Sequence, residues 1–333
     1  MGLRRRPANG RINLVPLRVL LTSASRKAPL LLALKEAVCR IDPKAEVIAG
    51  DVDPESPSRY IADHFWAMPR TEEAYIDSLL EGCIARGIRA ILPSRDGELL
   101  FWSRHKARFA EAGVAVIVSA PDAISRCVDK LAFAESGSSL GLPVIPAAPT
   151  PNPFGTSRLV VKERYGAGSI GLGLDLDVRA ARAHAASLSC PIFQPFAKGP
   201  EISIDAWLNR SGHVHGLVLR RRDRVLNGES HVTTTFRAIE LETLATSALE
   251  ALGLSGPVVM QAIVADGGLA IIETNPRFGG ASTTSIAVGL DLLFWSILEA
   301  VMPESILPAF VRDSREVRQV RFPRDILIYD PDL

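Results

Sequence analysis

The chain has 333 residues, of which 47% are hydrophobic and 23% charged, and a formal net charge of +1. A chain of this length can bury a full core and is expected to fold as two or three subdomains. The balanced charge argues against a broad nucleic-acid-binding surface, which requires a clustered basic excess. The four cysteines have no CxxC spacing, so they indicate neither a zinc site nor a disulfide framework and are expected to be buried thiols.

Three arginines at positions 4–6 precede apolar residues, an arrangement that resembles a signal peptide. Asn13, Pro16 and Arg18 interrupt the apolar stretch, so we expect a disordered tail over residues 1–16 instead. No apolar run reaches the ~18 residues that a membrane span requires. We therefore expect a soluble, cytoplasmic protein that binds neither nucleic acid nor membranes.

The first third of the chain alternates strands with helices. Apolar patterning predicts strands at 17–21, 46–49, 90–92 and 114–118, and helices at 28–38, 72–85 and 96–110. This alternation predicts an α/β domain with a parallel, doubly wound sheet and a ligand crevice at the carboxyl ends of its strands. The first turn, 22–26, lacks the glycines of a dinucleotide-binding site.

Three acids follow strands of this sheet. Asp51 is best explained as a turn or cap residue, because no glycine turn accompanies it. Asp96 and Glu98 allow two interpretations: contact with a substrate, or acids in the first turn of a helix that the helix dipole favours without any further role. The second interpretation is slightly preferred.

The middle third contains a glycine-rich stretch. A helix is predicted over 122–136, and five prolines within 143–153 then indicate a linker. After a strand at 158–162, Gly166, Gly168 and Gly171 match GxGxxG, but 172–176 continues as a strand, so a glycine-rich hairpin is predicted. Its amides could cover phosphate oxygens, with Lys162 adding positive charge. The alternative is a flexible surface turn.

An apolar hinge at 193–197 includes the end of a strand at 191–195 and precedes the next strand at 202–208. Its main chain could hydrogen-bond a flat base, while Glu201 accepts bonds from ribose hydroxyls. The alternative is an ordinary hairpin with a solvated glutamate. A helix is predicted between the glycine-rich stretch and the hinge, at 178–188.

The last third is predicted to contain strands within 212–222, helices at 241–252 and 291–301, and further strands at 317–322 and 326–329. His213 and His215 have no acidic or cysteine partner at metal-site spacing, so we expect exposed strand residues. The basic run 220–224 is typical of a solvated face.

An apolar strand at 269–272 precedes Glu273, Asn275 and Arg277. Alternate residues of a strand share a face, so Glu273 and Asn275 could aim two oxygens at one hard cation while Arg277 reaches an adjacent anion. This group suits metal-bound phosphate. A charged strand end followed by a turn explains the pattern equally well, so the motif does not decide by itself.

In their order along the chain, these pieces resemble the ATP-grasp superfamily, specifically its carbamoyl-phosphate-synthase-like members with a Rossmann-like preATP-grasp domain. The resemblance covers about 17–301. It implies an α/β preATP-grasp domain at 17–120, then an α+β ATP-binding part with a small lid subdomain at 121–196 and a catalytic subdomain at 197–301. Residues 302–333 form an extension to which it assigns no role.

The resemblance also assigns roles to residues. It implies a nucleotide-binding set composed of Lys130, Lys162, Gly166, Gly168, Ser169, Ile170, Gln194, Phe196, Ala197 and Glu201. It implies metal ligation by Gln261, Glu273 and Asn275, and a reaction centre with Arg277 and Arg222. The sequence departs from the family in a short, proline-rich segment before Lys162, in Pro195 of the hinge, and in a neutral Gln261 where some relatives have glutamate.

The implied activity is ATP-dependent carboxylate–amine ligation through an acyl phosphate, with Mg²⁺, or Mn²⁺ in its place. The alternative is a non-catalytic ATP-binding or regulatory module on the same fold. The expected partners are a small carboxylate, a small amine and a second copy of the chain in a homodimer. Loops at 22–26, 94–98, 229–236 and 279–284 are expected to select the substrate.

Overall fold

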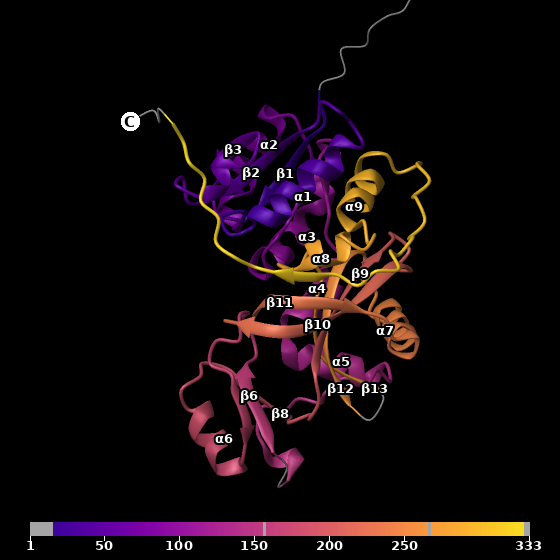
Figure 1. Cartoon of the computed structure of the whole chain (residues 1–333). Helices are drawn as coiled ribbons and strands as arrows, with labels where there is room; N and C mark the ends of the chain where they lie inside the picture. Colours follow the sequence, from indigo (N-terminus) through magenta and orange to yellow (C-terminus); the bar gives the residue numbers. More distant parts are fainter. Residues whose placement is uncertain (1–15, 156–157, 266–267, 330–333) are drawn as a thin grey trace, which may run out of the picture.

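A computed structural model describes residues 16–155, 158–265 and 268–329, which form three sheets with helices packed around them (Figure 1). The predicted disordered tail lies outside the described residues, apart from Pro16. Within those ranges, no helix is both long enough and apolar enough to span a bilayer. Cys83 and Cys127 are buried as expected, but Cys39 and Cys190 are exposed, so the expectation of four buried thiols is wrong.

The N-terminal part contains the predicted parallel sheet, in the order β3-β2-β1-β4-β5. The sequence missed β3, a short edge strand with only one buried residue, Trp66. The strands are β1 (Arg18–Thr22), β2 (Glu46–Asp51), β3 (His64–Ala67), β4 (Ile88–Leu92) and β5 (Ala115–Val116). The helices are α1 (Ala28–Cys39), α2 (Ile76–Ala85) and α3 (Asp96–Glu111), with 3₁₀ turns η1 (Pro57–Tyr60) and η2 (Glu73–Tyr75).

Both faces of this sheet are covered, because the side chains of β1 alternate between them. Val19 and Leu21 pack with α1 and with α9 (Leu292–Val301), whereas Leu20 packs with Trp102 of α3. The helices that follow β1 and β4 thus lie on opposite faces, and the strand order reverses between these two neighbouring strands. A crevice at the carboxyl ends of the strands is expected at such a switch point.

The single helix predicted over 122–136 is two helices, α4 (Pro121–Val128) and α5 (Lys130–Ser139). Asp129 between them is extended, and its carboxylate accepts hydrogen bonds from the backbone N–H groups of Leu131 and Ala132. An aspartate that caps the following turn in this way ends one helix and begins another. Lys130 is therefore the first residue of α5, not a mid-helix residue.

A small antiparallel sheet, in the order β7-β6-β8, carries α6 and a core that includes Leu159, Val161, Ala181 and Phe193. It lies at the lower left of Figure 1. Its elements are η3 (Asn152–Phe154), β6 (Leu159–Glu163), β7 (Gly173–Leu176), α6 (Val178–Ala185) and β8 (Pro191–Pro195). The β6–β7 pairing confirms the predicted hairpin around the glycine-rich stretch.

The large antiparallel sheet has the order β13-β12-β9-β10-β11-β14. Its strands are β9 (Glu201–Leu208), β10 (Val214–Leu226), β11 (Glu229–Phe236), β12 (Gly256–Ala265), β13 (Gly268–Asn275) and β14 (Arg318–Val320). The remaining helices are α7 (Ile239–Ala251) and α8 (Ser282–Ile286). The predicted strand at 317–322 is present only as β14, and residues 326–329 form no strand.

His215 is not the exposed strand residue that was expected. Its ring packs edge-on against Trp207 and Trp295, with centroid distances of 5.6 and 4.7 Å, and its Nε2 lies 2.8 Å from the carbonyl oxygen of Pro308. His213 is exposed as predicted, but it precedes β10 and lies outside the strand. The two imidazoles therefore have different surroundings, and His215 belongs to the packing around α9.

A buried ion pair lies inside the large sheet. Arg220 of β10 forms a bidentate pair with Asp205 of β9, and their side chains are 2% and 0% exposed. Asp205 also accepts hydrogen bonds from the hydroxyls of Ser282 and Ser285, at 2.9 and 2.5 Å. The carboxylate thus joins two strands to the loop and helix that follow Arg277. The expectation of a solvated face over 220–224 is wrong for Arg220.

Replacing Arg220 by leucine should lower the free energy of unfolding by about 3–5 kcal/mol, because Asp205 is left charged and buried without its partner. Urea denaturation followed by circular dichroism measures the change. Arg315→Ala is the control, since that side chain is 84% exposed and its pair with Asp313 lies at the surface. Unchanged stability in Arg220→Leu would contradict this account of the sheet.

Candidate functional site

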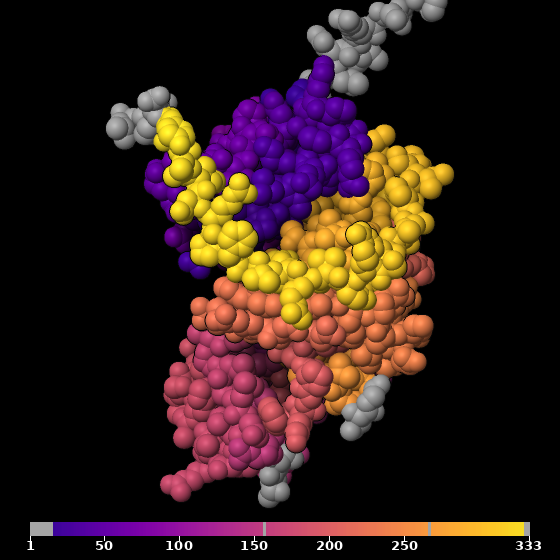
Figure 2. Space-filling model, in the orientation of Figure 1, coloured from indigo at the N-terminus to yellow at the C-terminus, as the bar shows by residue number. Residues whose placement is uncertain are grey.

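A cavity of about 1250 Å³ receives residues from all three sheets. Figure 2 shows the surface hollowed between the small sheet, in magenta, and the large sheet, in orange. All four loops that the sequence analysis named for substrate selection contribute residues to the lining. Every residue that the resemblance assigned to nucleotide, metal or reaction centre also lines it. The predicted site residues therefore lie around one space.

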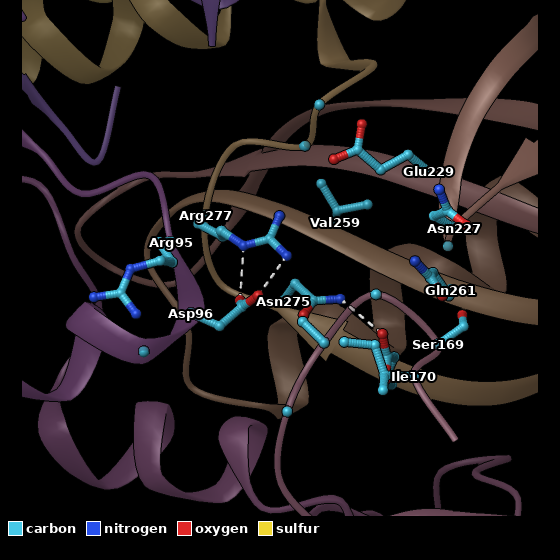
Figure 3. Close-up of a pocket in the computed structure, with 18 of the residues that line it drawn as sticks. Arg95, Asp96, Ser169, Ile170, Asn227, Glu229, Val259, Gln261, Asn275 and Arg277 are labelled. Carbon is cyan, nitrogen blue, oxygen red and sulfur yellow. Dashed lines mark hydrogen bonds and ion pairs between the residues drawn. The ribbon is translucent and has the colours of Figure 1, made fainter. Parts of the chain in front are cut away.

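A cluster of oxygen-bearing side chains lies at the end of β13. Gln261 of β12 stands opposite Glu273 of β13 in the strand register, and the Asn275 amide donates to Glu273 Oε1 at 3.2 Å (Figure 3). Among the described residues, no three histidine, cysteine or acidic side chains gather as a metal site. One carboxylate with two amides can supply oxygen ligands to a hard cation that also takes ligand and water oxygens.

Two lysines lie beside this cluster. Lys162 of β6 is only 8% exposed, and burial lowers the pKa of its amine to about 8, although Glu273 and Glu201 oppose this effect. The charge of Lys130, at the start of α5, also lowers the pKa of Lys162. The Nζ of Lys130 donates to the carbonyl oxygen of Gly166 at 2.6 Å. The two predicted lysines thus meet below the glycine-rich hairpin.

The glycine-rich hairpin contacts the large sheet. Gly166, Gly168 and Gly171 have φ values of 112°, 78° and 66°, which side chains rarely allow. The β10–β11 turn packs directly on the hairpin: a Cβ added to Gly228 would lie 2.7 Å from the backbone of Gly168. Ser169 of the hairpin lines the cavity together with Gln261 and Asn275 (Figure 3). The hairpin therefore closes over the oxygen cluster.

The hinge at 194–197 has both a side-chain and a backbone donor engaged within the protein. Gln194 is buried, and its side-chain amide donates to the Ile145 carbonyl oxygen at 3.0 Å. The Phe196 N–H donates to the Arg158 carbonyl oxygen at 2.8 Å. Phe196 and Ala197 both line the cavity. The side chain of Gln194 is thus engaged within the protein, and a flat ligand here would meet the main chain and the Phe196 ring.

Glu201 and Arg222, which the resemblance placed in different roles, are in contact. Arg222 Nε lies 3.1 Å from Glu201 Oε1, and Arg222 Nη2 donates to the Gly228 carbonyl oxygen at 2.9 Å. Burial raises the pKa of Glu201, and Glu273 adds to this effect while Arg222 and Lys162 oppose it. The pair links the start of β9 to the turn that supports the glycine hairpin.

Arg277 forms a clamp between the N-terminal sheet and β13. Its Nε and Nη2 donate to the two oxygens of Asp96 at 2.7 and 2.6 Å, across 181 positions of sequence (Figure 3). Asp96 is therefore more than a helix-terminal acid, so the preferred interpretation of this residue was incomplete. The guanidinium that the resemblance assigned to the reaction centre is paired with protein in this structure.

The other two acids agree with their local interpretation. Glu98 Oε1 accepts backbone N–H bonds from Ser94 and Arg95, at 2.9 and 3.1 Å, and so caps α3. The two oxygens of Asp51 accept bonds from the backbone N–H groups of Ser25 and Asp53. Both carboxylates stabilise the loops that form the N-terminal wall of the cavity.

Sequence reasoning missed two cations of that wall, Lys27 and Arg321. Lys27 directly follows a loop that was predicted to select the substrate, so its position was available as a signal. Arg321 comes from the C-terminal extension, and nothing in its local sequence indicates that it approaches Gly280 and Glu229. Only the pairing of β14 with β11 brings it there.

Comparisons with known proteins agree with this architecture. Residues 19–117 match the family model "PylC-like, N-terminal domain", and residues 190–321 match "ATP-grasp in the biosynthetic pathway with Ter operon". Among curated proteins, none matches the sequence.

Solved structures give the same fold at low sequence identity. The biotin carboxylase domain of Hydrogenobacter thermophilus 2-oxoglutarate carboxylase, bound to MgADP, ADP and bicarbonate, superposes with a TM-score of 0.69 at 17% identity, covering 90% of this chain and 73% of that one. Staphylococcus aureus N5-carboxyaminoimidazole synthetase with ADP superposes with a TM-score of 0.69 at 14% identity, covering 90% of this chain and 81% of that one. Bacillus licheniformis L-amino acid ligase superposes with a TM-score of 0.63 at 16% identity, covering 86% of this chain and 74% of that one. Residues 190–321 thus match an ATP-grasp family model, and the chain as a whole has the fold of these neighbours, the ATP-grasp fold with an N-terminal preATP-grasp-like domain.

Gly228→Ala should weaken ATP binding roughly tenfold, because the added methyl group overlaps the glycine hairpin and such overpacking costs ~1–3 kcal/mol. Gly113→Ala is the matched control: its φ of 77° resembles the 75° of Gly228, but its added Cβ meets no atom within 4 Å. Calorimetric titration with a non-hydrolysable ATP analogue compares the two variants. Equal affinities would show that the contact between the turn and the hairpin does not matter for binding.

Proposed function

We propose that this protein is an ATP-dependent ligase that joins a carboxylate to an amine. A carboxylate oxygen of the acid attacks the γ-phosphorus of ATP, giving ADP and an acyl phosphate. The amine then attacks the acyl carbon, inorganic phosphate leaves, and a C–N bond remains. The observation that carries the proposal is the convergence of Lys130, Lys162 and the glycine hairpin on the Gln261–Glu273–Asn275 cluster in one cavity.

Phosphoryl transfer requires mainly positioning and neutralisation of charge, and no nucleophilic side chain. Lys162 and Lys130 would bind phosphate oxygens, and the backbone of the hairpin would cover them. Gln261, Glu273 and Asn275 would hold Mg²⁺, or Mn²⁺ in its place, which neutralises phosphate charge when bound. The neighbouring structures that contain ADP or MgADP support ATP and Mg²⁺ as cofactors.

The nucleoside would occupy the hinge side of the cavity. Its base would lie along the main chain at 194–197, where the side chain of Gln194 is already engaged. Glu201 would accept a hydrogen bond from a ribose hydroxyl with one oxygen while Arg222 holds the other. Arg222 would then contact Glu201 beside the bound nucleotide and would also face the transferred phosphate. Arg277, held by Asp96, would position the acid that accepts the phosphate.

The acid and the amine would be small molecules bound between the γ-phosphate and the N-terminal sheet. Support comes from the L-amino acid ligase and the biotin carboxylases that share the fold. The dimeric biotin carboxylase domain supports a homodimer for this chain as well. Residues of all four substrate loops line the cavity, which supports a role for their side chains in specificity.

Glu273→Gln should reduce carboxylate-dependent ADP release at least about 100-fold, because loss of the carboxylate removes several kcal/mol of metal-assisted charge stabilisation. A coupled ADP assay over a panel of acids and amines measures the loss, and Glu240→Gln on the outer surface of α7 is the control. Full turnover in Glu273→Gln would contradict the proposed metal site. ATP binding without carboxylate-dependent ADP release in the wild type would favour the non-catalytic module.

In the absence of metal, ADP should bind more weakly as the pH rises above about 8, because the Lys162 amine of the unliganded protein loses its proton there. A bound phosphate favours the ammonium form and raises this pKa, so binding takes up a proton and the affinity falls by up to about tenfold per pH unit. Calorimetry between pH 7 and 9.5 measures the change. Lys162→Met should bind more weakly with a flatter profile, and a flat wild-type profile would exclude this role of Lys162.

A further inference from the structure

The end of the cavity next to the N-terminal sheet is rich in cations. Arg26 and Lys27 follow β1, Arg95 precedes α3, Arg277 follows β13 and Arg321 follows β14, and all five line the cavity. They come from segments distant in the sequence that meet at the switch point between β1 and β4. This is the position at which open α/β sheets bind ligands. Positive charge at this position would therefore act directly on a bound substrate.

The acids that line this end already have partners: Asp51 and Glu98 accept backbone N–H bonds, and Glu72 lies 3.8 Å from Arg70. Asp96 pairs with Arg277, and Glu229 pairs with Arg321. Lys27 is partly buried, and within the described ranges no carboxylate lies at ion-pair distance from it. Burial lowers the pKa of Lys27, and Arg277 and Arg321 lower it further, whereas Glu229 and Asp96 oppose them. A cation in this position would gain from an additional anion.

Arg321 has an unused donor at the same place. Its Nη atoms donate to the Gly280 carbonyl oxygen and to Glu229, but its buried Nε has no hydrogen-bond partner in the part of the chain that the structure describes. A buried donor without a partner is costly, so it normally bonds protein, water or a ligand. The strand before Arg321 is held in place, since the Thr283 hydroxyl donates to Gln319 Oε1 at 3.1 Å. Arg321 is thus positioned as a fixed cation.

We propose that the acid substrate carries a second anionic group, a carboxylate or a phosphate, which binds between Lys27 and Arg321. The proposal rests on the ligase function above and specifies its substrate class. The reacting carboxylate lies towards Glu273 and the γ-phosphate, and the second anion lies towards β1. Arg26 and Arg95, at the exposed rim, attract the dianion, whereas Lys27 and Arg321 hold it. Specificity for such acids then depends on both terminal segments of the fold.

Direct binding tests this proposal without catalysis. Butyrate, succinate and phosphoglycolate are titrated calorimetrically into the full chain, with and without a non-hydrolysable ATP analogue. Succinate or phosphoglycolate should bind at least roughly tenfold more tightly than butyrate, as expected for charge-assisted bonds to a second anion. The preferred dianion distinguishes a carboxylate site from a phosphate site. Lys27→Gln and Arg321→Gln should each remove most of the preference.

Arg318→Gln is the matched control, because Arg318 lies on β14 but donates to Thr234 and does not line the cavity. It should keep the full preference for dianions. Equal binding of butyrate and both dianions, no binding of either dianion, or an unchanged preference in Lys27→Gln would overturn the proposal. Affinity for the ATP analogue is measured separately, and its absence in the wild type would refute the ligase function instead.

Discussion

The buried pair between Asp205 and Arg220 supports the rest of the site. Charges removed from water must be paired and hydrogen-bonded, and here one carboxylate accepts bonds from a guanidinium and from two serine hydroxyls. Ser282 Oγ in turn accepts a bond from the Gly279 N–H at 2.8 Å. The loop after Arg277 is therefore fixed to the centre of the sheet. The buried ion pair thus holds in place a loop that forms part of the cavity wall.

The two sides of the cavity differ in how firmly they are held. The N-terminal sheet shares a continuous core with α9, and the Asp96–Arg277 pair ties it to β13, so these parts form one base. The small sheet has its own compact core and meets this base at the cavity through backbone contacts such as that of Gly168 with Gly228. Local contacts of that kind are opened more easily than a shared core. On the proposed function, the small sheet would act as a lid over the nucleotide, and the base would hold the acid in position.

Sequence patterns predicted the alternating N-terminal domain and the glycine hairpin, because periodicity is a local property, whereas the set of side chains around the cavity came from the family resemblance. They failed where one side chain serves a distant partner. Asp129 divides a helix because its carboxylate caps the following turn and pairs with Arg164, and Arg277 pairs with Asp96 across 181 positions. Arg321 gave no sequence signal, since its role depends on an edge strand of three residues. Pairings of this kind are settled by the fold, not by local pattern.

The position of β14 has a consequence for the order in which the site is assembled during synthesis. Domains fold largely from the N-terminus as the chain emerges from the ribosome, so the N-terminal sheet and the residues proposed to bind nucleotide are made before residues 318–321. Lys27 is among the first residues of the cavity to be made, and Arg321 is the last. On the proposed function, a nascent chain would acquire its nucleotide site before its acid site, and the acid site would be complete only when β14 pairs with β11.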